Sequence, residues 1–327
     1  MRTVRSLLHP VDLGELVGRE YEIRPPVTAK LLQRGFNDAY LVTDGDGVRR
    51  VLRVYTKDKY WLGSDADVRF ELELLDHLGM VGLSVAHPYR RRSGELLGRL
   101  DAPEGPRSYA LFTFAPGQPL GSHPFNERLW HAIGLEIARL HGAMDTFESS
   151  DSRHHLDLET LIDMPLAAIK PYVTPEEADT YSELNDIGQH LKDVISSNTW
   201  GPGTYGPIHA DPHDGNIHVT AEGTFTLFDF DHCGFGWRAY DLAPFYRHPA
   251  APEEGRRKWT AFLAGYEEVR TLSASERDSL PVFTACRALW DVGDWLRAAH
   301  WSGDAWALDG LCKRTLKRVR EPLAEPS

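Results

Sequence analysis

The spacing of hydrophobic positions differs between the two ends of the chain. In the first hundred or so residues, it is mostly the spacing that is typical of strands. Residues 39–55, AYLVTDGDGVRRVLRVY, have two β-rich arms around Asp-Gly-Asp-Gly, a pattern that predicts a β-hairpin. Residues 66–79, ADVRFELELLDHLG, repeat their apolar positions at helical spacing. Residues 108–114, SYALFTF, form a further apolar strand. We therefore expect a small sheet with one helix in this part of the chain.

Helical periodicity dominates from residue 122 onward. Four amphipathic patterns predict helices, over 124–144, 174–194, 252–270 and 275–299. The segment 208–234 interrupts them, because IHVT and TFTLFDF flank the short turn AEG and predict a second hairpin. The Pro/Gly-containing stretch 115–119 is the natural seam between the two parts of the chain.

Composition narrows the class of protein. The chain has 327 residues, of which 42% are hydrophobic and 26% charged, as in a soluble globular protein with more than one core. Its net charge of −12 argues against wrapping of nucleic acid and permits a cationic substrate. No apolar run reaches the roughly 18 residues of a membrane span. With no export signal and three widely spaced cysteines, we expect a cytoplasmic protein with reduced thiols.

The segment 208–234, IHADPHDGNIHVTAEGTFTLFDFDHCG, carries the candidate chemistry. Asp211 is followed five positions later by Asn216, and Asp229 comes at the far side of the predicted hairpin. This order is typical of phosphoryl transfer, in which one Asp accepts the hydroxyl proton while an Asn and a later Asp hold Mg²⁺. Magnesium prefers such oxygen ligands.

A transition-metal hydrolase is a competing interpretation of the same segment. His209, Asp211 and His213 alternate as strand ligands of a metal do. That arrangement leaves Asn216 without a role, and the phosphate-binding motif GxxxxGK[ST] is absent from the sequence.

HADPHDGNI and LFDFDHCGFGWRAYDLA together resemble the HGDxHxxN and IDFxD motifs of the aminoglycoside phosphotransferase and choline kinase family. The ending GWRAYDLA is similar to the bacterial branch with stress response kinases and homoserine kinase type II. The resemblance implies a protein-kinase-like α+β fold, with a β-rich N-lobe over 1–114 and a helical C-lobe over 115–327. It also implies ATP, or GTP, and Mg²⁺ as cofactors.

The resemblance assigns roles to residues of the C-lobe. Asp211 would be the catalytic base and His209 its packing support, while His213 would be structural. Asp241 would support the loop that contains Asp211, without contacting the substrate. Asn216 and Asp229 would be metal ligands. Asp231 would either assist a second metal ion or orient the substrate side. Ala210 departs from the family, which usually has glycine there.

Roles in the N-lobe follow in the same way. Arg53 takes the place of the phosphate-binding lysine, and Glu71 on the helix is its expected partner. The phosphate-covering turn would contain Gly35 and Asn37. The expected adenine-holding hinge contains Leu111, Phe112 and Phe114.

The acceptor remains open at this stage. Few residues separate Asp229 from Asp241, whereas protein kinases insert a long peptide-docking segment there, so a small and cationic hydroxyl compound is favoured. A Ser or Thr hydroxyl of a protein or precursor peptide is the alternative, and a catalytically silent nucleotide-binding module is another. Trp290, Trp295 and Trp301 with Asp291 and Asp294 form either an acceptor pocket or helix core. No oligomeric state is indicated.

Overall fold

The computed structural model of the protein describes residues 3–57, 59–246, 252–302 and 308–324, without the side chains of residues 252 and 298–302. The chain divides into two compact units. The first contains the chain up to Leu120 with Phe147–Arg153 and Asn216–Asp231. The second contains Gly121–Thr146, His154–Gly215 and the chain from His232 onward.

The first unit is built on antiparallel strands. Its helices are α1 (Pro10–Glu20) and α2 (Asp65–Met80). Its strands are β1 (Thr28–Arg34), β2 (Asp38–Thr43), β3 (Arg49–Val54), β4 (Gly98–Leu100), β5 (Arg107–Thr113), β6 (Gln118–Pro119), β8 (Ile217–Val219) and β9 (Phe225–Leu227). Five of the strands form one sheet in the order β1-β2-β3-β5-β4, and β6, β8 and β9 form a second. Both predicted hairpins are present, as β2–β3 and β8–β9.

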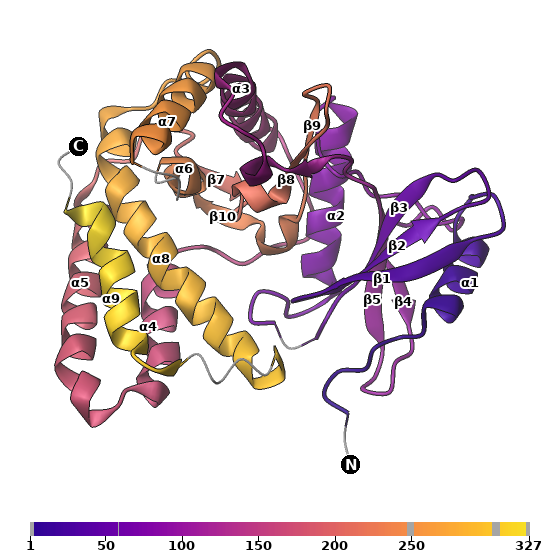
Figure 1. The fold of residues 1–327 in the computed structure, drawn as a ribbon, viewed down its shortest axis with the longest axis horizontal. Helices are drawn as coiled ribbons and strands as arrows, with labels where there is room; N and C mark the ends of the chain where they lie inside the picture. Colours follow the sequence, from indigo (N-terminus) through magenta and orange to yellow (C-terminus); the bar gives the residue numbers. More distant parts are fainter. Residues whose placement is uncertain (1–2, 58, 247–251, 303–307, 325–327) are drawn as a thin grey trace. The chain divides into compact units, whose positions relative to one another are not determined.

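The two helices of the first unit cover opposite faces of the five-stranded sheet (Figure 1). Leu52 and Val54 of β3 point to the face covered by α1, where they pack with Leu13 and Val17. Arg53 lies between them in the strand, so its side chain points to the face of α2. Because side chains alternate between the two faces of the sheet, β3 contributes apolar residues to the core under α1 and a charged residue to the face under α2.

The second unit is mostly helical. Its helices are α3 (Glu127–Met144), α4 (Met164–Ile169), α5 (Ala178–Ser197), α6 (Arg238–Tyr246), α7 (Pro252–Tyr266), α8 (Ala274–Ser302) and α9 (Leu311–Leu323). Strands β7 (Tyr205–Ile208) and β10 (Gly234–Trp237) pair antiparallel. The long helix α8 packs against α4, α6 and α9. A small antiparallel sheet followed by a helical remainder agrees with the predicted α+β class.

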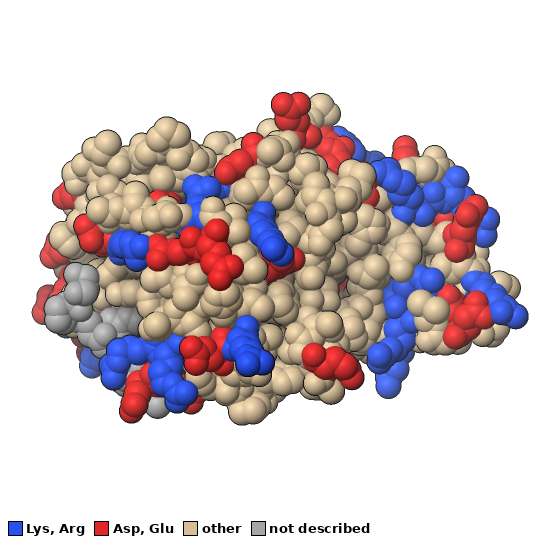
Figure 2. Space-filling model, turned by 90° about the horizontal axis from the view of Figure 1, so that it is seen from above, with Lys and Arg blue, Asp and Glu red and all other residues tan. Residues whose placement is uncertain are grey.

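Charges of both signs are dispersed over the surface drawn in Figure 2. On that face, Lys and Arg side chains alternate with Asp and Glu, and uncharged residues cover much of the area between them. The helices in the described part of the chain include none with the length and apolar character of a membrane span.

Helices α3 and α7 approach closely because each has a glycine at their contact. A Cβ atom on Gly134 of α3 would lie 1.9 Å from the Phe262 carbonyl oxygen. A Cβ atom on Gly265 of α7 would lie 1.9 Å from the His131 carbonyl oxygen. The two backbones could not keep this distance with any larger residue.

We expect the substitution Gly134→Ala to lower the free energy of unfolding by about 1–3 kcal/mol, because the methyl group would push the helices apart. Gly142→Ala on the same helix is the control, since its Cβ would meet nothing within 4 Å. That control should gain about 0.5–1 kcal/mol from helix propensity. Urea unfolding of both variants measures the difference, and equal effects would show that the close approach is not limiting.

Candidate active site

Residues 209–215, which contain the predicted base and are called the catalytic loop below, begin where strand β7 ends. Ala210 in this loop has a left-handed backbone, with a φ of 70°, a conformation that costs alanine about 1–2 kcal/mol. The buried carboxylate of Asp241 stabilises it by accepting hydrogen bonds from the N–H groups of His209, at 2.8 Å, and Ala210, at 2.7 Å. The family that has the HGDxHxxN motif usually has glycine at this position, and glycine adopts this backbone without that cost.

Asp241 is in turn held by a buried histidine. His141 of α3 places Nε2 3.2 Å from the Asp241 carboxylate and Nδ1 2.9 Å from the Tyr266 hydroxyl. Burial lowers the pKa of His141 to about 4, although its hydrogen bond with Asp241 acts in the opposite direction. The imidazole is therefore neutral, and it donates from Nε2 to Asp241 while accepting from Tyr266.

Asp211, the predicted base, is paired with Arg287 of α8. One terminal nitrogen of the guanidinium donates to Asp211 Oδ1, and the other donates to the Ala210 carbonyl at 2.6 Å. Burial disfavours the charged form of Asp211, but Arg287, His213 and His232 outweigh it and lower its pKa. Asp211 is therefore ionised at neutral pH, as an acceptor of a proton must be.

The two histidines of the catalytic loop contact its backbone. His209 is buried, and its Nδ1 accepts a hydrogen bond from the Asp211 N–H at 3.3 Å. His213 accepts from the Gly215 N–H at 2.9 Å through Nδ1, while its Nε2 lies 3.7 Å from Asp211 Oδ2. Within the described parts of the chain, no three His, Cys, Asp or Glu side chains converge as a metal-binding group.

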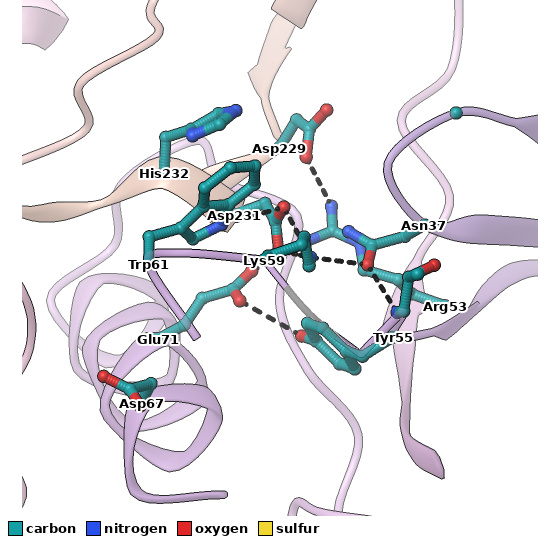
Figure 3. Close-up of polar contacts among 12 residues, drawn as sticks. Asn37, Arg53, Tyr55, Lys59, Trp61, Asp67, Glu71, Asp229, Asp231 and His232 are labelled. Carbon is teal, nitrogen blue, oxygen red and sulfur yellow. Dashed lines mark hydrogen bonds and ion pairs between the residues drawn. The ribbon is translucent and has the colours of Figure 1, made fainter. Parts of the chain in front are cut away.

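In the first unit, Arg53 joins two carboxylates (Figure 3). It donates to Glu71 of α2 at 2.7 Å and to Asp229 at 3.0 Å. Tyr55 donates its hydroxyl to the second oxygen of Glu71 at 3.2 Å. Burial opposes the charge of Arg53, but Asp229 and Glu71 raise its pKa. The expected ion pair between Arg53 and Glu71 is present, and Asp229 extends it to the segment after β9.

Asp229 has the second left-handed backbone of a non-glycine residue among the described residues, with a φ of 65°. Aspartate tolerates this conformation better than most residues. The Asp229 side chain is 44% exposed, and the Asn216 carbonyl accepts from the N–H of Phe228 at 3.0 Å. That hydrogen bond joins the residue before β8 to the residue before Asp229, so the β8–β9 hairpin brings the two predicted metal ligands to one end.

Asp231, predicted as a further metal ligand, is paired with a buried lysine. Lys59 Nζ donates to both of its carboxylate oxygens, at 2.8 Å each. Trp61 donates its indole N–H to the same carboxylate at 3.3 Å. Burial lowers the pKa of Lys59, and the Asp231 carboxylate opposes this effect. A metal ion would have to compete with Lys59 for Asp231.

The predicted phosphate-covering turn contacts the same lysine. Asn37 accepts through its side-chain oxygen from Lys59 Nζ at 2.7 Å and from the Thr56 N–H at 3.2 Å. Gly35 donates its N–H to the Asn37 carbonyl at 3.0 Å, and its own carbonyl accepts from Arg5 at 2.7 Å. Lys59 thus links this turn to Asp231, as Figure 3 shows.

The expected hinge residues differ in their surroundings. Leu111 and Phe112 lie inside β5 and pair with Leu52 and Val51 of β3. The carbonyl of Leu111 also accepts from the backbone of the neighbouring 87–89 segment, at 2.7 Å. These backbone groups therefore serve the sheet, and Phe114 is the expected hinge residue that lies beyond the strand.

Trp290, in the tryptophan stripe on α8, is packed, whereas Trp295 is partly buried. Trp290 is 3% exposed, and its ring centroid lies 4.9 Å from the Arg287 guanidinium and 4.8 Å from the His232 ring. Asp291 accepts from Arg287 at 2.7 Å. The side chain of Trp301 lies outside the described residues. These contacts favour helix core with paired charges over an open pocket.

Sequence analysis missed two residues that contact predicted site residues, Lys59 in the first unit and Arg287 in the second. Lys59 lies in the basic stretch RRVLRVYTKDKYW, where a lysine is usually solvated, and the nearby Trp61 is the only hint of burial. Arg287 stands four residues before Asp291, a spacing that predicts a pair on one helix face but not a contact with Asp211.

Residues 28–272 match the model of the phosphotransferase enzyme family. The chain belongs to this family. An uncharacterized protein of Deinococcus radiodurans is 37% identical over 295 residues, which cover 89% of this chain and 83% of that protein. A homoserine kinase of Methylorubrum populi is 28% identical over 291 residues, covering 85% and 84%. The predicted family and the prediction of a phosphotransferase are confirmed, and the transition-metal hydrolase is set aside.

Solved structures show the same fold. The microcompartment-associated aminopropanol kinase has a TM-score of 0.79 at 24% identity and covers 96% of this chain and 98% of that chain. Amicoumacin kinase hAmiN, solved in complex with AMP-PNP, Ca²⁺ and Ami, has a TM-score of 0.75 at 21% identity and covers 95% and 92%. The predicted protein-kinase-like α+β fold is confirmed.

The buried His141 gives the stability a pH dependence. Its pKa is lowered from 6.5 to about 4, so between these values the unfolded chain binds a proton that the native state does not. The free energy of unfolding is therefore largest above the higher value, and it should fall by about 2 kcal/mol by pH 5 from this residue alone. Urea unfolding at about pH 7.5 and pH 5 should show a smaller loss for His141→Gln, which can still donate to Asp241. An equal loss in both proteins would contradict the assignment.

Lys59→Met should lower the free energy of unfolding by about 3–5 kcal/mol, because it removes the cation that neutralises the buried carboxylate of Asp231. The double substitution Lys59→Met with Asp231→Leu should recover much of this loss, since it removes both charges. Lys57→Met is the control: Lys57 is exposed, and its replacement should change the stability by less than about 0.5 kcal/mol. Additive losses in the double variant would show that the two side chains do not depend on each other.

Proposed function

We propose that this phosphotransferase moves the γ-phosphate of ATP to the hydroxyl of a small compound that also carries an amine. The observation that carries the proposal is the Asp211 carboxylate, paired with Arg287 on a loop that Asp241 holds, in a chain that also pairs Arg53 with Glu71 and Asp229. Family membership supports the transfer of phosphate. The AMP-PNP in the structure of amicoumacin kinase supports ATP as donor.

Asp211 acts as the base in this proposal. Its carboxylate accepts the proton of the acceptor hydroxyl as the oxygen attacks the γ-phosphate, and ADP leaves with the electron pair of the broken P–O bond. His209 supports the loop through its contact with the Asp211 N–H. Asp241 holds the backbone that precedes Asp211, and His213 has a structural role.

Asp229 and Asn216 would hold a divalent metal ion, for which we propose Mg²⁺. Their oxygens are ligands that Mg²⁺ prefers, and the partly exposed carboxylate of Asp229 suits a cation that keeps water and phosphate ligands. When bound, the ion neutralises charge on the phosphates. We assign Asp231 to the positioning of this segment through Lys59, with metal contact as the weaker alternative.

The remaining nucleotide contacts are assigned to residues 1–114. Arg53 would bind phosphate oxygens, with Glu71 fixing its guanidinium. The turn with Gly35 and Asn37 would cover the phosphates. Because the backbone groups of Leu111 and Phe112 are used by the sheet, the base would be held at Phe114, the expected hinge residue beyond β5. Residues 115–327 would bind the acceptor.

An amine-bearing acceptor is supported by the relatives and by charge. Homoserine and aminopropanol, named in two relatives, each carry a hydroxyl and an amine. The net charge of −12 suits a cationic compound. None of the relatives and structures described above is named for a peptide substrate, so the Ser/Thr alternative is retained only as an outcome of the test.

The test incubates the protein with Mg²⁺ and γ-labelled ATP, together with homoserine, 1-amino-2-propanol, an aminoglycoside panel and Ser/Thr peptides. We expect label in a hydroxy amine and not in its deaminated analogue, 4-hydroxybutyrate or 2-propanol. Asp211→Asn should lower kcat by about 10²–10⁴-fold while the Kd for ATP stays within about threefold. Asp229→Ala should abolish transfer. Asp186→Asn, at an exposed position of α5, is the matched control and should keep full activity.

Three results would contradict parts of the proposal. Full activity of Asp211→Asn would remove the base assignment. Label in peptides alone would show that the acceptor is a polypeptide. ATP that raises the melting temperature without any transfer of label would identify a nucleotide-binding module without kinase activity towards these acceptors.

A further inference from the structure

The guanidinium of Arg287 contacts the catalytic loop at two adjacent groups. It donates to the Asp211 carboxylate and, at 2.6 Å, to the carbonyl of Ala210. The carbonyl belongs to the residue with the left-handed backbone. A single planar side chain therefore fixes both the direction of the base and the strained peptide before it.

Arg287 is itself held in place on helix α8. Its Nε donates to Asp291 at 2.7 Å, and the other oxygen of Asp291 accepts from Arg318 of α9 at 2.8 Å. Its guanidinium also lies 4.9 Å from the centroid of the buried Trp290 ring. Three nitrogens of Arg287 thus have protein partners, and its side chain is only 14% exposed. An arginine held in this way is part of the loop's support and not a mobile surface charge.

We propose that Arg287 is a positioning residue for the phosphotransfer reaction, which fixes the orientation of the Asp211 carboxylate and keeps it ionised for proton acceptance. This inference rests on the proposed role of Asp211 as the base. It adds a residue outside 28–272, the part of the chain that matches the family model.

The electrostatic part of the role follows from the groups that face Asp211. These groups are Arg287 from α8, His213 from the catalytic loop and His232 from the turn before β10. Burial works against the charge of Asp211, and Arg287 is the strongest of the three in opposing it. Without the guanidinium, a buried carboxylate holds its proton to higher pH.

The orientational part follows from which oxygen Arg287 occupies. It binds Oδ1 of Asp211, whereas Oδ2 lies on the side of His213, 3.7 Å from its Nε2. Because Arg287 holds Oδ1, the carboxylate cannot rotate freely. Its other oxygen, Oδ2, therefore stays in one orientation relative to the incoming hydroxyl group. Loss of this constraint lowers the fraction of bound acceptor in a reactive geometry, which affects kcat more than KM.

The kinetic test compares wild type with Arg287→Gln and Arg287→Lys, using the hydroxy amine that accepts label in the assay above. For Arg287→Gln we expect kcat to fall by about 10- to 100-fold while the KM for ATP stays within about twofold. The acid limb of its kcat/KM profile should move to higher pH, because Asp211 then stays protonated to higher pH. Arg287→Lys keeps the positive charge but cannot bind both loop groups at once. Its acid limb should therefore lie close to that of wild type, whereas its kcat should stay well below the wild-type value.

Arg277→Gln is the matched control. Arg277 lies on the same helix and makes an exposed ion pair with Glu267, so its loss should leave kcat and the pH profile unchanged. Asp291→Asn tests the support of the guanidinium and serves as a milder variant in case Arg287→Gln does not fold. It should lower kcat less than Arg287→Gln does.

A measurement without any acceptor separates this inference from the proposed function. In protein labelled with ¹³C at aspartate carboxyls, the Asp211 signal is identified by its absence in Asp211→Asn. We expect this signal to titrate at higher pH in Arg287→Gln than in wild type. An unchanged titration together with an unchanged pH profile would overturn the inference, as would an effect confined to the KM of the acceptor. Failure of the wild type to label any acceptor would instead contradict the proposed function.

Discussion

The left-handed backbone at Ala210 in the second unit, and at Asp229 in the first, is the constraint on which the predicted site residues of each unit depend. Among the described residues these two are the non-glycine residues with positive φ. Ala210 directly precedes the predicted base Asp211, and Asp229 is a predicted metal ligand. Such conformations cost of order 1–3 kcal/mol and persist only where surrounding contacts impose them. Around Ala210 these contacts are the Asp241 carboxylate and Arg287. Around Asp229 they are Arg53 and the Phe228–Asn216 hydrogen bond.

In both units, the residues near these two positions are held by buried charged side chains that bind to one another or to backbone groups. In the second unit, Asp241 is satisfied by two backbone N–H groups and His141. In the first unit, Lys59 neutralises Asp231 and also reaches Asn37. Buried ion pairs contribute little net stability compared with apolar packing, because removing charges from water is costly. These buried pairs lie beside the two residues with left-handed backbone. They hold that backbone in one geometry, and they contribute less stability than apolar side chains would in the same places.

Sequence patterns predicted the two hairpins and most of the helices because these are local, whereas the protein-kinase-like fold was predicted from the family resemblance. The hairpins are encoded by turn residues and alternation, and the spacing of Asp211, Asn216 and Asp229 follows from a loop and a hairpin of fixed length. Lys59 and Arg287 were missed because their function depends on partners far along the chain. Arg287 is 76 residues from Asp211, and Lys59 is 172 residues from Asp231. The left-handed Ala210 was also hidden, since alanine carries no signal for that backbone.

The pairing of Asp211 with a guanidinium has a consequence for the chemistry. A carboxylate whose pKa is lowered is a weak base, so it is poorly suited to removing the hydroxyl proton before the P–O bond breaks. In a loose transition state the attacking oxygen gains little positive charge until bond breaking is advanced, and the proton becomes acidic late. A weak but ionised and firmly oriented base suits that order of events. In the proposed mechanism, Arg287 lowers the basicity of Asp211 and fixes its direction at the same time, which favours orientation over proton affinity at this position.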